Sequence, residues 1–332
     1  MFKPKVRYIR AFTLIELLVV ISVITLLMAV FGISANKVNQ VARNLKQKAQ
    51  MHSMEVGLEL YLKDFGDYPD SDPVNAAGSY VYGPQHLTEA LFGRDLAGFE
   101  VNSKFHGTGD GTLNGAAITD YYKPYSDISQ NRRKGPYMQI KEGGVDVIYM
   151  NYGTTPLYST AELTAGSIYH DSSLAFDPSD LDSQYNTAAP VIVDVFRQKK
   201  IERPSGENTY VGTPVLYFKA NRGSKLFSSD GPGSGATYSS LKEWTYNYFD
   251  NSGFYELPNL KNPTDPDTTH RFSPGYTDPV TGLTGIEAFY DYITNDKVSS
   301  FDQAQNPEGF LLISAGRDGI YGTKDDVTNF ER

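Results

Sequence analysis

Three aspartates lie close together near the carboxyl end, in the stretch FLLISAGRDGIYGTKDDVTNF. Asp318, Asp325 and Asp326 place three carboxylates within nine residues, and such charges repel one another unless a cation neutralises them. Hard cations such as calcium bind carboxylate and backbone carbonyl oxygens, and the interspersed glycines let a backbone turn its carbonyls inward. The spacing differs from that of an EF-hand, so the residues alone leave a metal site and a solvated acidic turn open.

A fourth unusual acid, Glu16, lies in the apolar stretch FTLIELLVVISVITLLMAVFGISA. The preceding MFKPKVRYIRA carries four positive charges and no negative one, which predicts membrane insertion with this end in the cytoplasm. The run from Leu17 to Ile33 is roughly 25 Å long as a helix. Together with Phe12 to Ile15, this run can span a bilayer core of about 30 Å. A carboxylate there costs a few kcal/mol and indicates a specific cationic partner.

The composition excludes several classes of function. The chain has 332 residues with 40% hydrophobic residues, enough for a large buried core, and its net charge of -9 argues against nucleic-acid binding. The absence of cysteine excludes disulfides, thiolate metal sites and cysteine nucleophiles. The five histidines lack paired metal-ligand spacing, and neither a phosphate-binding loop nor a nucleophile elbow occurs, so we predict no enzyme activity.

Periodicity predicts the elements that position these acids. Apolar residues at three- and four-residue steps extend the first helix from Phe12 to Phe65, roughly 80 Å, and it ends near Gly66. The remaining chain reads as short strands and long loops with few helices. The expected strands are Val145–Met150, Val191–Phe196, Val215–Phe218 and Phe310–Ser314, and the expected short helices are Gln85–Phe92 and Gly285–Tyr292.

One aromatic segment allows two interpretations. Trp244, Tyr246 and Tyr248 stand at alternate positions, which favours a half-buried strand with its aromatic side chains packed on one side. The other interpretation is a face that binds a sugar or a protein.

The amino-terminal residues RAFTLIELLVV closely resemble the class III signal of type IV pilins and type II secretion pseudopilins. The resemblance implies that prepilin peptidase cleaves between Ala11 and Phe12 and methylates the new amino group of Phe12. Most family members have glycine where this chain has Ala11. Glu16 becomes the fifth mature residue, and the resemblance implies that it meets the amino terminus of a neighbouring subunit and sets the register of a filament.

The carboxyl-terminal residues carry a second resemblance. The pattern S-A-G-x-D-G-x-x-G-T-x-D-D-x-T-N, residues 314–329, is similar to the calcium loop of the major pseudopilin of type II secretion. It implies calcium ligands from the side chains of Asp318, Asp325 and Asp326, and weaker candidates from the backbone carbonyls of Ser314 and Ile320. Calcium would then hold the loops of a cysteine-free domain.

Together these features predict an α+β, pilin-like fold, in which a long amino-terminal helix packs on an antiparallel sheet. We expect a leader at residues 1–11, a transmembrane and polymerisation helix at residues 12–35, and a periplasmic globular domain at residues 36–332. Within that domain we expect the rest of the helix at residues 36–66, an enlarged variable body at residues 67–310, and the calcium-loop region at residues 311–330.

The expected function is that of a non-enzymatic, major-pseudopilin-like subunit, anchored once in the inner membrane and polymerised into a periplasmic filament that drives type II protein secretion. Its expected partners are further copies of itself, other pseudopilins, the assembly platform and prepilin peptidase. Two alternatives stay open: a pilin of a surface pilus for adhesion or DNA uptake, and a membrane-anchored periplasmic binding protein or enzyme.

Overall fold

A computed structural model describes most of the helical and carboxyl-terminal parts of the chain. The described residues are 13–76, 79–93, 98–100, 112–113, 116–117, 131–138, 146–151, 168–170, 188–197, 199–202, 208–233, 235–255 and 269–330. The chain divides into two units, residues 1–45 and 46–332, and each is described by itself.

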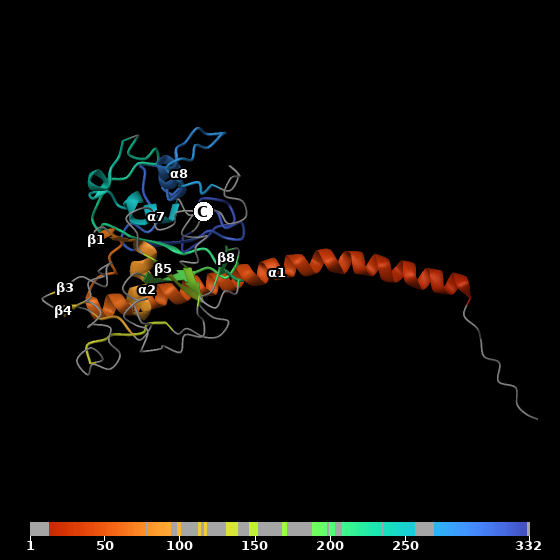
Figure 1. The fold of residues 1–332 in the computed structure, drawn as a ribbon. Coiled ribbons are helices and arrows are strands. Elements are labelled where there is room, and N and C mark those ends of the chain that lie inside the picture. The colour runs from red at the N-terminus through yellow and green to blue at the C-terminus, as the bar shows by residue number, and fades with distance from the viewer. Residues whose placement is uncertain are drawn as a thin grey trace, which may run out of the picture. The chain divides into compact units, whose positions relative to one another are not determined.

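The first helix, α1, runs without interruption from Leu14 to Phe65, 52 residues or about 78 Å, which confirms the predicted long helix and its end (Figure 1). At that end the Gly66 amide donates to the Leu62 carbonyl at 2.7 Å, and Gly66 has a φ of 80°, which glycine adopts readily. No helix in the described part of the chain is both long enough and apolar enough to cross a membrane. The predicted leader and Phe12 lie outside the described residues.

The second unit combines short helices with small antiparallel sheets, which confirms the α+β class. Its other helices are α2 (Gly83–Phe92), η2 (Tyr238–Leu241), η3 (Tyr248–Asn251), α7 (Ser252–Tyr255) and α8 (Gly285–Tyr292). The strands are β1 (Val74–Ala76), β2 (Ser79–Val81), β3 (Thr112–Leu113), β4 (Ala116–Ala117), β5 (Asp146–Asn151), β6 (Ile168–His170), β7 (Ala188–Val193), β8 (Lys199–Glu202), β9 (Asn208–Val211), β10 (Leu216–Lys219), β11 (Phe310–Ser314) and β12 (Val327–Thr328). Within the described residues these strands form two-stranded sheets, β1-β2, β3-β4 and β8-β9, and three-stranded sheets with the strand orders β6-β5-β7 and β10-β11-β12.

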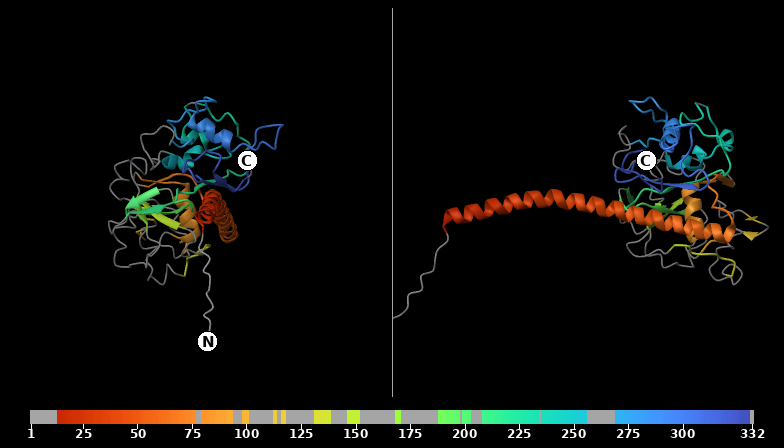
Figure 2. Two further views of the ribbon diagram at one scale, coloured as in Figure 1. Left: turned by 90° about the vertical axis from the view of Figure 1, so that its right-hand side faces the viewer. Right: turned by 180° about the vertical axis from the view of Figure 1, so that it is seen from behind.

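The β10-β11-β12 sheet is covered on both faces. Its side chains alternate between two hydrophobic clusters because successive residues of a strand point to opposite faces. On one face, a cluster contains the sheet residues Leu216, Phe218, Leu311 and Ile313 together with Phe289 and Tyr290 of α8. On the other face, a cluster contains the sheet residues Tyr217, Phe310 and Leu312 together with Met51, Met54 and Leu58 of α1 and Leu87 and Leu91 of α2. The sheet therefore lies between α8 on one side and the outer part of α1 with α2 on the other (Figure 2).

The outer part of α1 is fixed by polar as well as apolar contacts. The Gln50 side-chain amide donates to the Val193 carbonyl at 2.9 Å, and the Gln47 side-chain oxygen accepts from the Val195 amide at 2.9 Å. Both glutamine side chains are buried. They bond to backbone groups at the end of β7 and in the turn after it, and such directional contacts define how far the helix is rotated as well as which face it buries.

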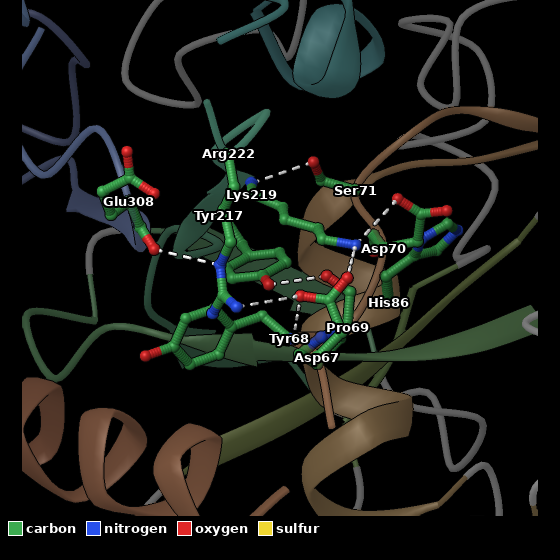
Figure 3. Close-up of polar contacts among 10 residues, drawn as sticks. All are labelled: Asp67, Tyr68, Pro69, Asp70, Ser71, His86, Tyr217, Lys219, Arg222 and Glu308. Atoms are coloured by element: carbon green, nitrogen blue, oxygen red, sulfur yellow. Dashed lines mark hydrogen bonds and ion pairs between the residues drawn. The ribbon is translucent and has the colours of Figure 1, made fainter. Parts of the chain in front are cut away.

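The chain leaving α1 is tied to β10, as Figure 3 shows. Lys219 Nζ lies 2.8 Å from a carboxylate oxygen of Asp67 and 3.9 Å from one of Asp70. The Tyr217 hydroxyl donates to the Pro69 carbonyl at 2.7 Å and is fully buried. Because exposed ion pairs contribute only about 0–1 kcal/mol, the buried tyrosine bond and the packing beneath it hold this exit more firmly than the lysine does.

Most sequence predictions of elements agree with the structure. The bounds of β11 and α8 are those predicted, and β5, β10 and α2 differ from the predictions by one or two residues. The strand predicted at residues 191–196 lies at residues 188–193 and is followed by a turn.

The strand interpretation of Trp244, Tyr246 and Tyr248 is wrong. Trp244 forms an isolated parallel bridge with Leu226, and the residues after it bend into the 3-10 helix η3. Tyr246 and Tyr248 are nevertheless buried in the core, and their hydroxyls donate to the carbonyls of Asn306 and Phe272 at 2.5 Å each. These distant carbonyls satisfy the tyrosines, so no strand pairing is required to bury them.

Candidate metal centre and amino-terminal motif

The aspartate loop is a closed turn between two paired strands. β11 ends at Ser314, the chain turns through residues 315–326, and β12 returns so that Val327 pairs with Ser314. Each of Asp318, Asp325 and Asp326 offers a carboxylate oxygen, and these three oxygens all lie within 4.8 Å of one another. The structure therefore brings the three predicted residues together.

Two glycines permit the close path of this loop. Gly316 has a φ of 63°, and a Cβ on it would come 2.2 Å from the backbone oxygen of Asp325. Gly322 has a φ of 89°, and a Cβ there would come 2.6 Å from Cβ of Arg271. Both positions combine left-handed backbone with contact to backbone or a rigid part of a side chain, so larger residues would force the loop open.

Asp325 is the acceptor around which the start of the loop is organised. Its Oδ2 accepts from the backbone amides of Arg317 and Asp318 at 2.8 and 2.9 Å. Its Oδ1 accepts from the Thr323 hydroxyl at 2.6 Å. The Asp318 Oδ1 in turn accepts from the Ile320 amide at 2.8 Å.

Asp326 is held by one donor within the loop and one outside it. Its Oδ2 accepts from the Gly322 amide at 2.7 Å and from the hydroxyl of Tyr292, the last residue of α8, at 2.8 Å. The Tyr321 amide donates to His270 Nδ1 at 3.1 Å, and the Arg271 amide donates to the Tyr321 carbonyl at 2.9 Å. The loop is thus fixed by contacts with α8 and with residues 270–271.

Thr323 is a site residue that the sequence analysis missed. Its hydroxyl contacts both Asp325 and Asp326 and lies 3.3 Å from the Ile320 carbonyl oxygen. The signal was present, because the threonine belongs to the pattern G-T-x-D-D. The Ser314 hydroxyl donates instead to Asp194 at 3.3 Å, and the ligand roles of the Ser314 and Ile320 carbonyls stay predictions.

The three carboxyls differ in their tendency to ionise. Burial, with further contributions from the charges of Asp318 and Asp325, raises the pKa of Asp326 to about 8. Burial also raises the pKa of Asp318, and the neighbouring Asp325 adds to this effect. Burial opposes ionisation of Asp325 too, but hydrogen bonds from Thr323, Asp318 and Arg317 outweigh it and lower the pKa of Asp325. Ionising all three groups is therefore unfavourable without a counter-charge.

A divalent cation fits this arrangement. Oxygens that share one calcium ion at about 2.3–2.6 Å cannot be much more than about 5 Å apart, and the three carboxylate oxygens meet that limit at 4.8 Å. Hard oxygen ligands suit calcium better than a soft transition metal. A cation bound here would connect the loop after β11 to the residue before β12 and, through Tyr292, to α8.

At the amino terminus, Glu16 takes part in a capping box that the sequence analysis also missed. The Thr13 amide and hydroxyl donate to Glu16 Oε2 at 2.9 and 2.8 Å, and the Glu16 amide lies 3.3 Å from the Thr13 hydroxyl. The pattern Thr-x-x-Glu at a helix start is the signature of this motif. Within one chain, Glu16 therefore helps α1 begin, whatever further contact it makes.

Comparison with known proteins identifies only the amino-terminal segment. Residues 6–32 match the family model of the prokaryotic N-terminal methylation motif. No curated protein and no solved structure matches the chain. The matched residues include the Ala11–Phe12 bond and Glu16, and this motif indicates a type IV pilin-like protein that is processed as a prepilin.

The raised pKa of Asp326 predicts how the stability of the metal-free protein depends on pH. A carboxyl whose pKa is near 8 when folded and about 3.9 when unfolded stabilises the protein below that range, and this contribution is lost as pH rises through 8. In the presence of a chelator, the thermal midpoint of wild type should fall between pH 5 and 8 relative to that of Asp326→Asn. Parallel pH profiles of the two proteins would contradict the assignment.

Proposed function

We propose that this chain is a structural, major-pseudopilin-like subunit that assembles into a periplasmic filament driving type II protein secretion. The observation that carries the proposal is the methylation motif at residues 6–32. The proposal adds that prepilin peptidase cuts between Ala11 and Phe12 and methylates Phe12. The carboxyl-terminal aspartate loop supports the finer assignment, because its pattern and its clustered oxygens fit a calcium loop of the pseudopilin kind.

The start of α1 supports a role in membrane anchoring before assembly. Its apolar side chains are exposed in the single chain, with Leu14 81% exposed and Leu26 68% exposed. Such a surface is unfavourable in water, at about 25 cal/mol per Å² of apolar area. In the proposal, the inner membrane covers residues 12–35 first, with the globular domain in the periplasm, and neighbouring copies, other pseudopilins and the assembly platform contact the helix afterwards.

Glu16 has two roles in this proposal. In the free subunit its carboxylate accepts hydrogen bonds from Thr13 at the beginning of α1. In the filament it pairs with the methylated amino group of Phe12 on a neighbouring copy, and each charge then offsets the desolvation cost of the other. One such pair per subunit would fix the axial register of the filament.

Calcium has a structural role in the proposal. Asp318, Asp325 and Asp326 would be its side-chain ligands, and the chemistry supplied is the neutralisation of three carboxylates. Because the ion binds the folded loop better than the unfolded chain, it would stabilise the domain by mass action. The chain itself catalyses nothing in this account.

Processing can be tested by mass spectrometry of the protein purified from cells that contain prepilin peptidase. We expect the mature chain to begin with N-methylated Phe12. Ala11→Gly should be processed at least as fully, because the family most often has glycine there. A chain that keeps Met1 under these conditions would overturn the proposal.

Assembly can be tested separately from helix capping by Glu16→Gln. Glutamine also completes a capping box, so this variant should keep α1 and insert normally while losing the charge needed for the intersubunit pair. We expect filament yield to fall at least tenfold, measured by shearing and immunoblotting.

The matched control is Thr13→Val, which removes the capping hydroxyl but leaves the Glu16 charge. It should assemble close to wild type. Normal filament yield from Glu16→Gln, or equal losses in both variants, would show that the charge has no special role.

Calcium binding can be tested by thermal unfolding of the purified protein with calcium or with a chelator. Calcium should raise the midpoint of wild type by several degrees, and Asp325→Ala should abolish this difference. Asp296→Ala, which removes an exposed aspartate outside the loop, should retain it. Because Asp325 also orders the loop, the quantity to compare is the difference between each protein's thermal midpoints with calcium and with the chelator. If this difference in Asp325→Ala equals that of wild type, the site is refuted.

A further inference from the structure

A polar cavity of about 580 Å³ lies beside the residues that follow α1, at the carboxyl-terminal end of β10. Three segments that are distant in sequence line it: residues 67–72 after α1, residues 219–222 at the end of β10, and residues 242–250 before and within η3. Figure 3 shows five lining side chains from the first two segments, those of Asp67, Asp70, Ser71, Lys219 and Arg222. Its size lies within the range of about 300–1,000 Å³ typical of small-ligand sites.

The charged groups of this wall are already paired with one another. Lys219 bridges Asp67 and Asp70, and Arg222 lies 3.7 Å from Asp67 while its Nε donates to the Glu308 carbonyl at 3.1 Å. These contacts hold the side chains in place, yet several of their donors and acceptors still face solvent. A ligand entering here meets fixed hydrogen-bonding groups of both kinds and little uncompensated charge.

The second wall continues this pattern. Lys242 Nζ lies 5.0 Å from the centre of the Tyr238 ring, and the Tyr238 hydroxyl donates to the Asp72 carboxylate. Lys242 and Asp72 both line the cavity and both are exposed. A donor, Lys242, and an acceptor, Asp72, thus both line the cavity and both contact Tyr238.

The cavity is also bordered by a buried acid with an unused oxygen. The Asp250 side chain is 2% exposed, and its Oδ2 accepts from the Ser71 hydroxyl at 2.6 Å. Its Oδ1 is buried and has no hydrogen-bond partner among the described residues. Buried polar atoms are usually satisfied, so an unpaired carboxyl oxygen beside a cavity points to a missing partner. Burial raises the pKa of Asp250 well above its ordinary value and so favours the neutral carboxyl.

An aromatic side chain completes the lining. Trp244, the single tryptophan of the chain, lines the cavity and is partly exposed. Its ring is held by Tyr290 of α8, with ring centroids 5.0 Å apart. A fixed indole offers a flat apolar surface next to the polar groups.

We propose that this cavity binds a neutral saccharide, with the Asp72, Lys242 and Asp250 side chains bonding its hydroxyls and Trp244 packing against the face of a sugar ring. Each sugar hydroxyl both donates and accepts, which matches walls that mix donors and acceptors. A polycation would have to separate the Lys219 pairs, and an anion would meet the carboxylates of Asp67, Asp70, Asp72 and Glu243. This inference is independent of the filament role, because it concerns only the second unit.

The test uses the full-length purified chain in a zwitterionic detergent, since detergents with sugar head groups would compete. Excitation at 295 nm reports on Trp244 alone, so its fluorescence can be titrated with maltose, cellobiose, lactose, mannobiose and chitobiose. Spermidine and glucuronic acid serve as charged comparison probes. We expect at least one neutral disaccharide to change the emission saturably below 10 mM, and neither charged probe to do so.

Variants then place the binding in the cavity. Asp72→Ala and Lys242→Ala change exposed rim residues and should each weaken the saturating sugar at least fivefold, while Lys225→Ala, an exposed lysine outside the cavity, should not. Asp250→Leu should abolish binding, with circular dichroism to check its fold.

Three results would overturn the proposal. In the first, none of the neutral sugars changes the fluorescence saturably. In the second, only spermidine does so, which would indicate a cation site. In the third, the rim variants bind the sugar as tightly as wild type. Filament formation is not measured here, so failure of this inference leaves the processing and assembly tests unaffected.

Discussion

Strand β11 buries side chains on both of its faces, and the positions of the candidate sites depend on this packing. Leu311 and Ile313 face the cluster that contains α8, while Phe310 and Leu312 face the cluster that contains α1 and α2. Burying each such side chain is worth roughly 1.5–3 kcal/mol, so displacement of this strand would be costly on both sides at once. A strand fixed in this way provides a rigid end from which the aspartate loop begins.

The loop illustrates how packing and charge oppose each other. The β11–β12 pairing, the left-handed glycines of the loop and the Tyr292 hydroxyl bring three carboxyls together, and burial then makes their joint ionisation unfavourable. Either protons or a cation can relieve this repulsion, and at neutral pH a cation does so without requiring protonation of a carboxyl. The proposed calcium ion would thus neutralise the repulsion that the fold creates among these carboxyls.

The exit of α1 connects the proposed filament helix to the rest of the second unit. The same residues that tie the exit to β10, Lys219 with Asp67 and Asp70, form one wall of the proposed saccharide cavity. A ligand bound there would contact the segment through which the globular domain is joined to its helix.

The sequence by itself determined the features that arise from neighbouring residues. The helical periodicity up to Phe65, the apolar run of β11, the bounds of α8 and the spacing of the three aspartates are all local patterns, and the structure or the family comparison agrees with them. The methylation motif is likewise a contiguous segment. Local patterns are readable because backbone preference and side-chain period act over only a few residues.

Only the tertiary structure decided which distant residues meet. Nothing local to Lys219 indicates that it pairs with Asp67, or that Tyr292 bonds to Asp326. Tyr246 and Tyr248 mimic a strand by their spacing, yet they are buried because far carbonyls accept their hydroxyls. Such contacts depend on how β10 and β11 bring separate segments together. Burial is non-directional, so the apolar period shows which face of an element is buried but not which distant segment packs against it.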